Sequence, residues 1–160
     1  TLLSANAQEA VVSWRGEQHT LGLSKQVAGA GRYAEAQVSE VSIPADDLGQ
    51  YRIRGAINNH YVDFLIDTGA SVVALSSATA DAIGIDYQRG QPGSVQTAQG
   101  NAESYFMTLE KVTVAGITAH NVQAAIIKGQ FPVDILLGMS FLKQVSIQEN
   151  RGVMTLVQNY

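Results

Sequence analysis

A carboxylate directly follows an apolar run in residues 64–76, which read FLIDTGASVVALS. Asp67 comes after three apolar residues, so a strand that leads into a core would carry a negative charge at its end. Burying an ionised carboxylate costs free energy unless partners stabilise it. Two interpretations are open at this point. Asp67 caps the turn that follows it, or it is an acid that works in a shaped, dry site.

The next residues give this acid a loop that is suited to chemistry. Thr68 adds a hydroxyl that can lock the loop, and Gly69 lets backbone approach a ligand closely. Asp and Gly are also common in ordinary turns. The tripeptide alone therefore favours a structural turn, and its surroundings must decide whether it is catalytic.

Short apolar runs at close spacing surround the motif. In residues 50–57, Tyr51, Ile53 and Gly55 alternate with the charged Arg52 and Arg54, as expected for a half-buried strand. Asn58-Asn59 tolerates positive φ and predicts a hairpin turn into the strand that carries Asp67. Further strands are predicted at residues 38–43, 61–67, 72–75, 94–98, 103–116, 117–127, 134–138 and 145–158, the last with a turn at 149–152.

Only one clear helix signal accompanies these strands. Ser76 or Ser77 can cap a helix that runs to about Ile83, and Gly84 is its C-terminal stop. Many short strands with little helix predict an all-β fold, either a small barrel or a sandwich.

The first 37 residues differ from the rest of the chain. Residues 10–23 predict a hairpin, and residues 24–36 are a Gly- and Ala-rich linker. The pattern Ala5-Asn6-Ala7 is typical of the end of an export signal, with a mature chain from around Gln8, but an Ala-rich terminus would look the same. We therefore expect an N-terminal extension, 1–37, and one domain, 38–160. Export would place the protein in the periplasm or tethered to the membrane on the periplasmic side, and otherwise it is cytoplasmic.

Composition excludes several classes of function. The net charge is −4 and the 10 basic residues are scattered, which argues against a nucleic-acid partner. There is no Cys, so disulfides, thiolate metal sites and Cys nucleophiles are impossible. His19, His60 and His120 lie far apart without metal-ligand spacing, so we expect no metal. Gly-rich phosphate loops and the G-x-S-x-G motif are absent as well, and we expect no cofactor.

Three segments of the sequence, spread over residues 64–142, form a pattern when they are taken in their order along the chain. FLIDTGA at 64–70 is followed by the polar, Gly-containing segment TAQGNAESYF at 97–106, and then by ILLGMSFL at 135–142. This arrangement resembles the retropepsin-like aspartic proteases, in which an active-site loop, a flap hairpin and an apolar-apolar-Gly segment before a short helix occur in this order. The resemblance covers about residues 38–160 and looks closest to the bacterial single-domain members, which are often exported or membrane-tethered.

The resemblance implies a fold and a set of roles. The fold would be a retropepsin-like closed barrel of short strands with a flap hairpin and one or two short helices. An extended peptide would lie as an added strand between flap and floor. Asp67 would be catalytic, Thr68 would brace paired loops, and Gly69 and Ala70 would contact the substrate backbone. The flap tip would be formed by Ala98, Gln99 and Gly100.

Peptide hydrolysis by carboxylates needs two of them, close enough to share one proton. Asp134 lacks a following Thr-Gly loop, and a surface or turn-capping role suits it better. Asp63 lies four residues before Asp67, about 13 Å away at the rise of a strand. A homodimer would supply the second Asp67 by symmetry.

The function that follows is an aspartic endopeptidase. Its rival is a non-catalytic dimerisation or peptide-binding module of the same fold, whose mark would be loss of Asp67 or Gly69. Residues 152–158 are apolar on both strand faces. We expect this terminal strand to pair with its symmetry mate, which would cover an exposed edge, although a strand inside its own barrel would show the same pattern.

Overall fold

The computed structural model describes residues 2–5, 9–14, 17–22, 40–97 and 100–159, and it divides into two compact units, Thr1–Gln37 and Val38–Tyr160. In the first unit, the strands β1 (Leu2–Ala5), β2 (Glu9–Trp14) and β3 (Glu17–Gly22) form an antiparallel sheet in that order. Strands β2 and β3 pair as a hairpin within the range predicted for one, 10–23. The predicted linker at 24–36 lies outside the described residues.

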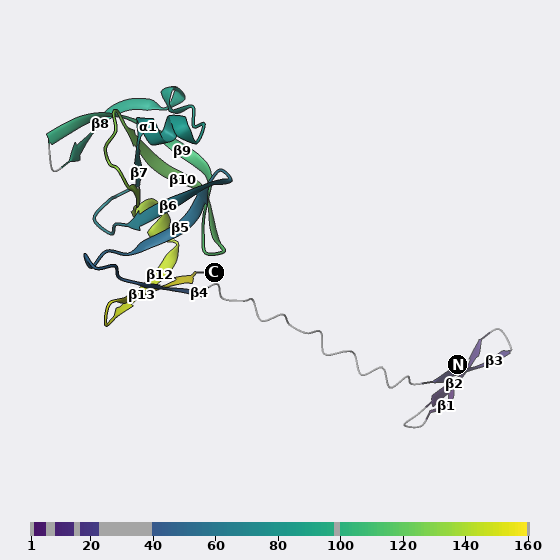
Figure 1. Cartoon of the computed structure of the whole chain (residues 1–160). Helices are drawn as coiled ribbons and strands as arrows, with labels where there is room; N and C mark the ends of the chain where they lie inside the picture. The colour runs from purple at the N-terminus through teal and green to yellow at the C-terminus, as the bar shows by residue number, and fades with distance from the viewer. Residues whose placement is uncertain (1, 6–8, 15–16, 23–39, 98–99, 160) are drawn as a thin grey trace. The chain divides into compact units, whose positions relative to one another are not determined.

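The second unit is built mainly of short strands (Figure 1). Its strands are β4 (Glu40–Pro44), β5 (Arg52–Ile57), β6 (His60–Ile66), β7 (Val73–Ser76), β8 (Gln91–Thr97), β9 (Gly100–Val114), β10 (Ile117–Ile127), β11 (Ile135–Leu137), β12 (Val145–Asn150) and β13 (Val153–Gln158). Its helices are α1 (Ser77–Ala82), the 3-10 helix η1 (Tyr87–Arg89) and α2 (Met139–Leu142). None of the helices in the described ranges is long and apolar enough to cross a membrane.

Six of these strands close on themselves. They are hydrogen-bonded in the order β10-β7-β11-β6-β5-β9, and β9 pairs again with β10. Closure removes the free sheet edges, and the side chains that point inward fill the barrel with an apolar core. Phe64, Leu109, Leu137 and Phe141 are among the residues that are fully buried there. The predicted all-β closed barrel is confirmed.

The turn before the Asp67 strand and the two ends of helix α1 lie where the sequence predicts them. Asn58 and Asn59 have φ of 47° and 73° in the β5–β6 turn, as predicted. The Ser76 side chain accepts a hydrogen bond from the Thr79 backbone N–H and caps α1. Gly84 follows the helix with φ of 71°. The β5–β6 turn and the start of α1 are therefore fixed by short-range chemistry.

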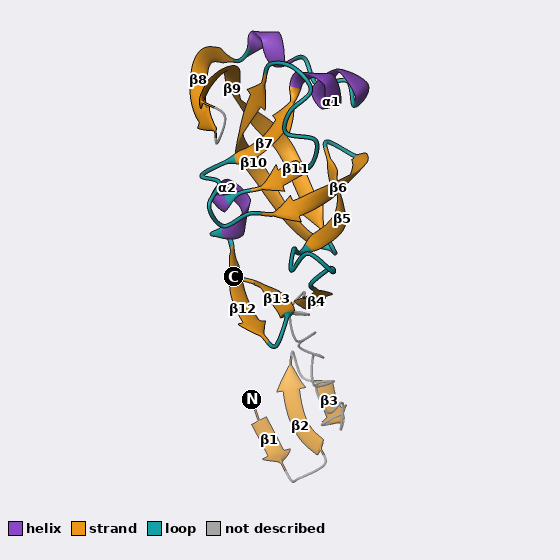
Figure 2. Ribbon diagram, turned by 60° about the vertical axis from the view of Figure 1, so that its left-hand side comes forward, coloured by secondary structure: helices purple, strands orange, loops and turns teal. Residues whose placement is uncertain are grey.

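A separate sheet at one end of the barrel has the order β12-β13-β4 (Figure 2). The terminal strand β13 is its central strand, because Met154 pairs with Glu149 on one side and with Ile43 on the other. Both hydrogen-bonding edges of β13 are therefore used within the chain. The expectation that this strand pairs with its symmetry mate is wrong. Its apolar pattern on both faces belongs to a strand that lies inside its own sheet.

One buried hydroxyl ties α2 to two barrel strands. The Ser140 Oγ accepts a hydrogen bond from the Val73 backbone N–H (3.0 Å) and donates one to the Gln123 carbonyl oxygen (2.7 Å). Ser140 is only 8% exposed and Val73 is fully buried, so loss of the hydroxyl would leave the Val73 N–H without this partner in a dry environment. This bond network holds the first residue of β7, which directly follows the Asp67 loop.

We predict that Ser140→Ala lowers the free energy of unfolding by about 2 kcal/mol, because the buried Val73 N–H and the part-buried Gln123 carbonyl lose their partner. Ser146→Ala is the matched control, since Ser146 is exposed and its hydroxyl bonds only the Asn159 side chain among the hydrogen bonds of the described residues. The control should change stability by less than about 0.5 kcal/mol. Urea denaturation of the two variants measures both values, and equal losses would contradict this role for Ser140.

Candidate active site

Asp67 stands where β6 ends, beside the end of β11. Ile66 pairs with Leu137 in parallel register, and the Asp67 backbone N–H donates to the Leu137 carbonyl oxygen (3.2 Å). The side chain is half-buried, and its Oδ1 accepts a hydrogen bond from the Gly69 backbone N–H (2.9 Å). The carboxylate thus closes its own turn, as the first interpretation of the sequence required, and this bond also fixes its orientation.

The Asp67 loop is locked against the segment that joins β11 to α2. The Met139 backbone N–H donates to the Ala70 carbonyl oxygen (2.8 Å). A Cβ on Gly138 would collide with the Val72 carbonyl oxygen and lie 2.7 Å from that of Ala70. Gly138 has an extended conformation with φ of −90°, so it is required for space and not for its torsion angle. This close approach explains why glycine follows the apolar pair of β11.

A cleft of about 930 Å³ opens beside Asp67. Its walls come from the Asp67 loop, the β8–β9 hairpin, the end of β10 and the segment that follows β10. The lining is mostly apolar or uncharged, and only Asp67 and Lys128 among the described lining residues carry charge. The residues that line it are Asp67, Gly69, Ala70, Ser71, Val72, Ala74, Val95, Gln96, Thr97, Ala102, Phe106, Ala125, Ile127, Lys128, Gly129, Gln130, Phe131, Pro132 and Leu136.

The structure brings together only some of the site residues that the sequence predicted. Asp67, Gly69 and Ala70 line the cleft, whereas Thr68 is exposed and is not part of its lining. Gly100 begins β9 with φ of 117° and also lies outside the lining. The other two residues proposed for the flap tip, Ala98 and Gln99, lie outside the described residues.

A long hairpin covers one side of the cleft. Strands β8 and β9 pair in antiparallel register from Gln91↔Phe106 to Thr97↔Gly100. The half-buried Phe106 lines the cleft, and a Cβ on Gly93 would lie 2.7 Å from its ring. Glycine at position 93 therefore leaves room for a large aromatic side chain on the cleft side of this hairpin.

An ion pair joins this hairpin to the end of β10. The Lys128 Nζ lies 2.8 Å from the Glu103 Oε2, and the Lys128 backbone N–H donates to the Glu103 carbonyl oxygen (2.9 Å). The Glu103 side chain hydrogen-bonds the ammonium and raises the pKa of Lys128, while Lys128 lowers the pKa of Glu103. Both side chains are exposed, so solvent weakens the attraction. The backbone bond is the firmer of the two connections.

The other acids near the motif have partners of their own. Asp63 is exposed and pairs with Arg54 (3.2 Å). Asp134 binds the guanidinium of Arg52 through both carboxylate oxygens, at 2.6 and 3.0 Å, and is neither a turn cap nor part of the cleft lining. The hydrogen bonds from Arg52 lower the pKa of Asp134. This pair therefore keeps its charges in mildly acidic solution and is lost only as the pH falls through the lowered pKa.

No group of three or more side chains that could hold a metal ion occurs in the described ranges. The chemistry available at the site is that of a single carboxylate among the described lining residues, a peptide loop that is held in place around it and a mostly apolar cleft.

Residues 53–144 match the family model described as "gag-polyprotein putative aspartyl protease". The chain belongs to the retropepsin-like aspartic protease family. The crystal structure of a retropepsin-like aspartic protease from Rickettsia conorii is similar, with a TM-score of 0.67 and 27% sequence identity over 76% of this chain and 92% of that one. The family recognised from three sequence segments is thereby confirmed.

Two curated relatives are similar in sequence. An uncharacterized protein of a Sinorhizobium species is 31% identical over 105 residues, which is 64% of this chain and 45% of the relative. An uncharacterized protein of Rickettsia prowazekii is 29% identical over 109 residues, 68% of this chain and 46% of the relative. The chain thus spans about half the length of the curated relatives that it matches.

We predict that Gly138→Ala lowers the free energy of unfolding by more than about 2 kcal/mol, because its methyl group would force the two loops apart. Gly84→Ala is the comparison: it has open space but φ of 71°, and its strain should cost about 1 kcal/mol. Chemical denaturation of both variants separates crowding from torsional strain. A Gly138→Ala loss no larger than that of Gly84→Ala would mean that the loops are not in tight contact.

Proposed function

We propose that the protein is an aspartic endopeptidase that works as a homodimer with one Asp67 from each chain. The observation that carries the proposal is that a large cleft contains a single carboxylate among its described lining residues. Two carboxylates are needed for this chemistry, and the nearby Asp63 and Asp134 are engaged with arginines. A second copy related by two-fold symmetry is the simplest source of the missing acid.

The proposed mechanism divides the work between the two Asp67 carboxyl groups, which share one proton. The ionised group takes a proton from water as the water attacks the peptide carbonyl carbon. The protonated group donates a hydrogen bond to the carbonyl oxygen, where negative charge develops. The bond from the Gly69 N–H to Asp67 Oδ1 supports this step, because it holds each carboxyl group in one orientation before substrate arrives.

The proposed substrate is an extended peptide that lies between the β8–β9 hairpin and the Asp67 loop. An extended peptide can bond to backbone on both sides while its alternate side chains enter pockets. Val95, Phe106 and Ile127 give these pockets apolar walls, so we expect apolar side chains near the cleaved bond. Thr68, which is exposed in the single chain, would brace the paired loops at the dimer axis.

We predict that Asp67→Asn reduces peptide cleavage by about a thousandfold or more, because an amide cannot accept and return the proton. Asn is nearly the same size, so the fold should persist. Asp63→Asn is the matched control, since Asp63 is an exposed acid on β6, the strand that leads to Asp67, and should leave the rate within about twofold. Cleavage of an unstructured protein, with and without pepstatin, measures both rates.

Two outcomes of that assay would overturn the proposal. Substantial turnover by purified Asp67→Asn protein would remove Asp67 from the mechanism. A wild-type chain that binds peptides but cleaves none, at any pH or protein concentration, would instead be the binding module.

We predict that the rate per subunit falls on dilution, because the proposed site exists only in the dimer. Cleavage rates measured over a range of protein concentrations should fall at the concentration at which sedimentation shows dissociation. A rate per subunit that stays constant below that concentration would contradict the shared site.

We predict that Ala70→Ser moves the pH optimum, expected in mildly acidic solution, to lower pH. A hydroxyl in the Asp67 loop can donate a hydrogen bond to the carboxylate and favour its ionised form. Ala82→Ser, on the exposed face of α1 and outside the cleft lining, is the control. The pH profiles of kcat/KM for both variants test this, and an unchanged or more alkaline optimum for Ala70→Ser would count against it.

A further inference from the structure

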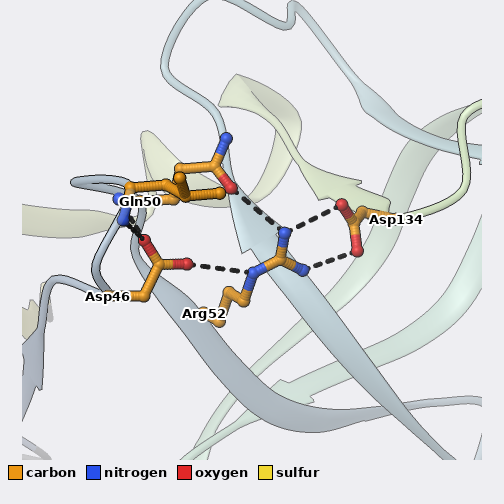
Figure 3. Close-up of polar contacts among 5 residues, drawn as sticks. Asp46, Gln50, Arg52 and Asp134 are labelled. Atoms are coloured by element: carbon orange, nitrogen blue, oxygen red, sulfur yellow. Dashed lines mark hydrogen bonds and ion pairs between the residues drawn. The ribbon is translucent and has the colours of Figure 1, made fainter.

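Arg52 is the centre of a polar network outside the cleft (Figure 3). Its Nε lies 3.2 Å from the Asp46 Oδ2, and its Nη1 and Nη2 donate to the two Asp134 oxygens at 2.6 and 3.0 Å. The Nη2 also donates to the Gln50 Oε1 (3.0 Å). The planar guanidinium is thus held from three sides, which fixes its position far better than a single surface contact would.

One side of this network is a rigid turn. The Asp46 Oδ1 accepts hydrogen bonds from the backbone N–H groups of Leu48 and Gln50, both at 2.9 Å. The Asp46 backbone N–H donates to the Gln50 carbonyl oxygen (2.8 Å). The two backbone N–H groups that bond the Asp46 carboxylate, of which that of Gln50 has the larger effect, lower the pKa of Asp46. Its carboxylate is therefore charged and available to Arg52. The turn is an anchor that does not depend on the cleft.

The other side of the network is Asp134, the last residue of the segment 128–134, which forms one wall of the cleft through its first five residues. Residues 128–132 line the cleft, and Asp134 comes directly before β11. At its start this wall is held by Ser77, whose Oγ accepts from the Gly129 N–H (3.0 Å) and lies 3.2 Å from the Gly129 carbonyl oxygen. At its end the Asp134 side chain is held by Arg52.

Between these two ends, packing holds only one residue of the wall, the half-buried Pro132, while residues 130, 131 and 133 are exposed. Phe131 is 62% exposed and Val133 is 75% exposed, so burial contributes little to their positions. The path of residues 130–133 therefore depends mainly on the contacts at the two ends of the segment. Arg52 fixes one of those ends although it does not line the cleft itself.

We propose that Arg52 is a positioning residue that fixes the cleft wall formed by residues 128–134, and through this wall sets how tightly the substrate side chain beside Phe131 and Pro132 is bound. The inference rests on the proposed protease function. Asp67 is held by separate contacts with Gly69 and Leu137, so loss of Arg52 changes substrate binding and leaves the chemical step in place.

The chain offers a matched control on the same strand. Arg54 lies two residues further along β5 and pairs with Asp63 at the same Nε distance of 3.2 Å, with no contact to the wall among its ion pairs. The test compares Arg52→Gln, Asp134→Asn and their double variant with Arg54→Gln, all in the full chain. Arg52→Lys is added because it keeps the charge but loses the two-pronged contact.

Hydrogen exchange gives a readout that does not depend on activity. The backbone amides of residues 130, 131, 133 and 134 should exchange faster in Arg52→Gln and in Asp134→Asn, and at the wild-type rate in Arg54→Gln (Pro132 has no amide hydrogen). With a peptide that the wild-type chain cleaves, KM should rise about fivefold in both wall variants while kcat stays within about twofold, as expected for a partly exposed ion pair. The double variant should raise KM no more than either single variant, because both substitutions break the same ion pair. Arg52→Lys should raise KM less than Arg52→Gln, but not restore the wild-type value.

The opposite results would overturn the inference. Unchanged exchange in residues 130–134, equal changes in Arg54→Gln, or a fall in kcat as large as the rise in KM would each exclude a positioning role for Arg52. A failure of the proposed function looks different, because the wild-type chain would then cleave no peptide. In that case the exchange comparison still decides whether Arg52 fixes the wall of the cleft.

Discussion

The structure of the site depends on the contact between the Asp67 loop and Gly138. A loop that presents a carboxylate at the end of an apolar strand needs a rigid support, and here the support is backbone packed on backbone. The absence of a Cβ at position 138 lets the carbonyl oxygens of Ala70 and Val72 lie against β11 and α2. Met139 then bonds Ala70, and Ser140 bonds Val73, so the whole loop is held from its start to the first residue of β7.

This rigid support has a consequence for mechanism. The carboxylate of Asp67 is oriented by its own loop and faces a wide, mostly apolar cleft, but it is the one acid among the described residues there. A lone carboxylate can serve as a base or as an acid, but it cannot be both in one step. The proposed dimer follows from this chemical requirement and not from any special feature of the outer strands.

Local features of the structure were predictable from the sequence. The Asn58-Asn59 turn, the Ser76 cap and most of the barrel strands follow from short-range torsion preferences and side-chain alternation. The fold family followed from three segments in order. These features depend on residues that are close in sequence, so a single chain contains the necessary information.

Features that depend on distant residues were missed. The partner of Asp134 is Arg52, 82 positions earlier, and neither residue signals the other in the sequence. The terminal strand β13 was expected at a dimer edge, because its apolar pattern shows which faces are buried but not which strands lie beside it. Most of the cleft lining was missed for the same reason, since residues 95–136 meet the Asp67 loop only after the barrel closes.

The central claim is that two chains share one catalytic pair, and mixing chains tests it most directly. A fixed amount of wild-type chain is equilibrated with increasing amounts of Asp67→Asn chain, at concentrations at which sedimentation shows dimers, and peptide cleavage is measured. If the site is shared, the rate per wild-type chain falls toward zero, because wild-type chains become trapped in dimers with one carboxyl group. A rate per wild-type chain that does not change as mixed dimers form would show that each chain carries a complete site.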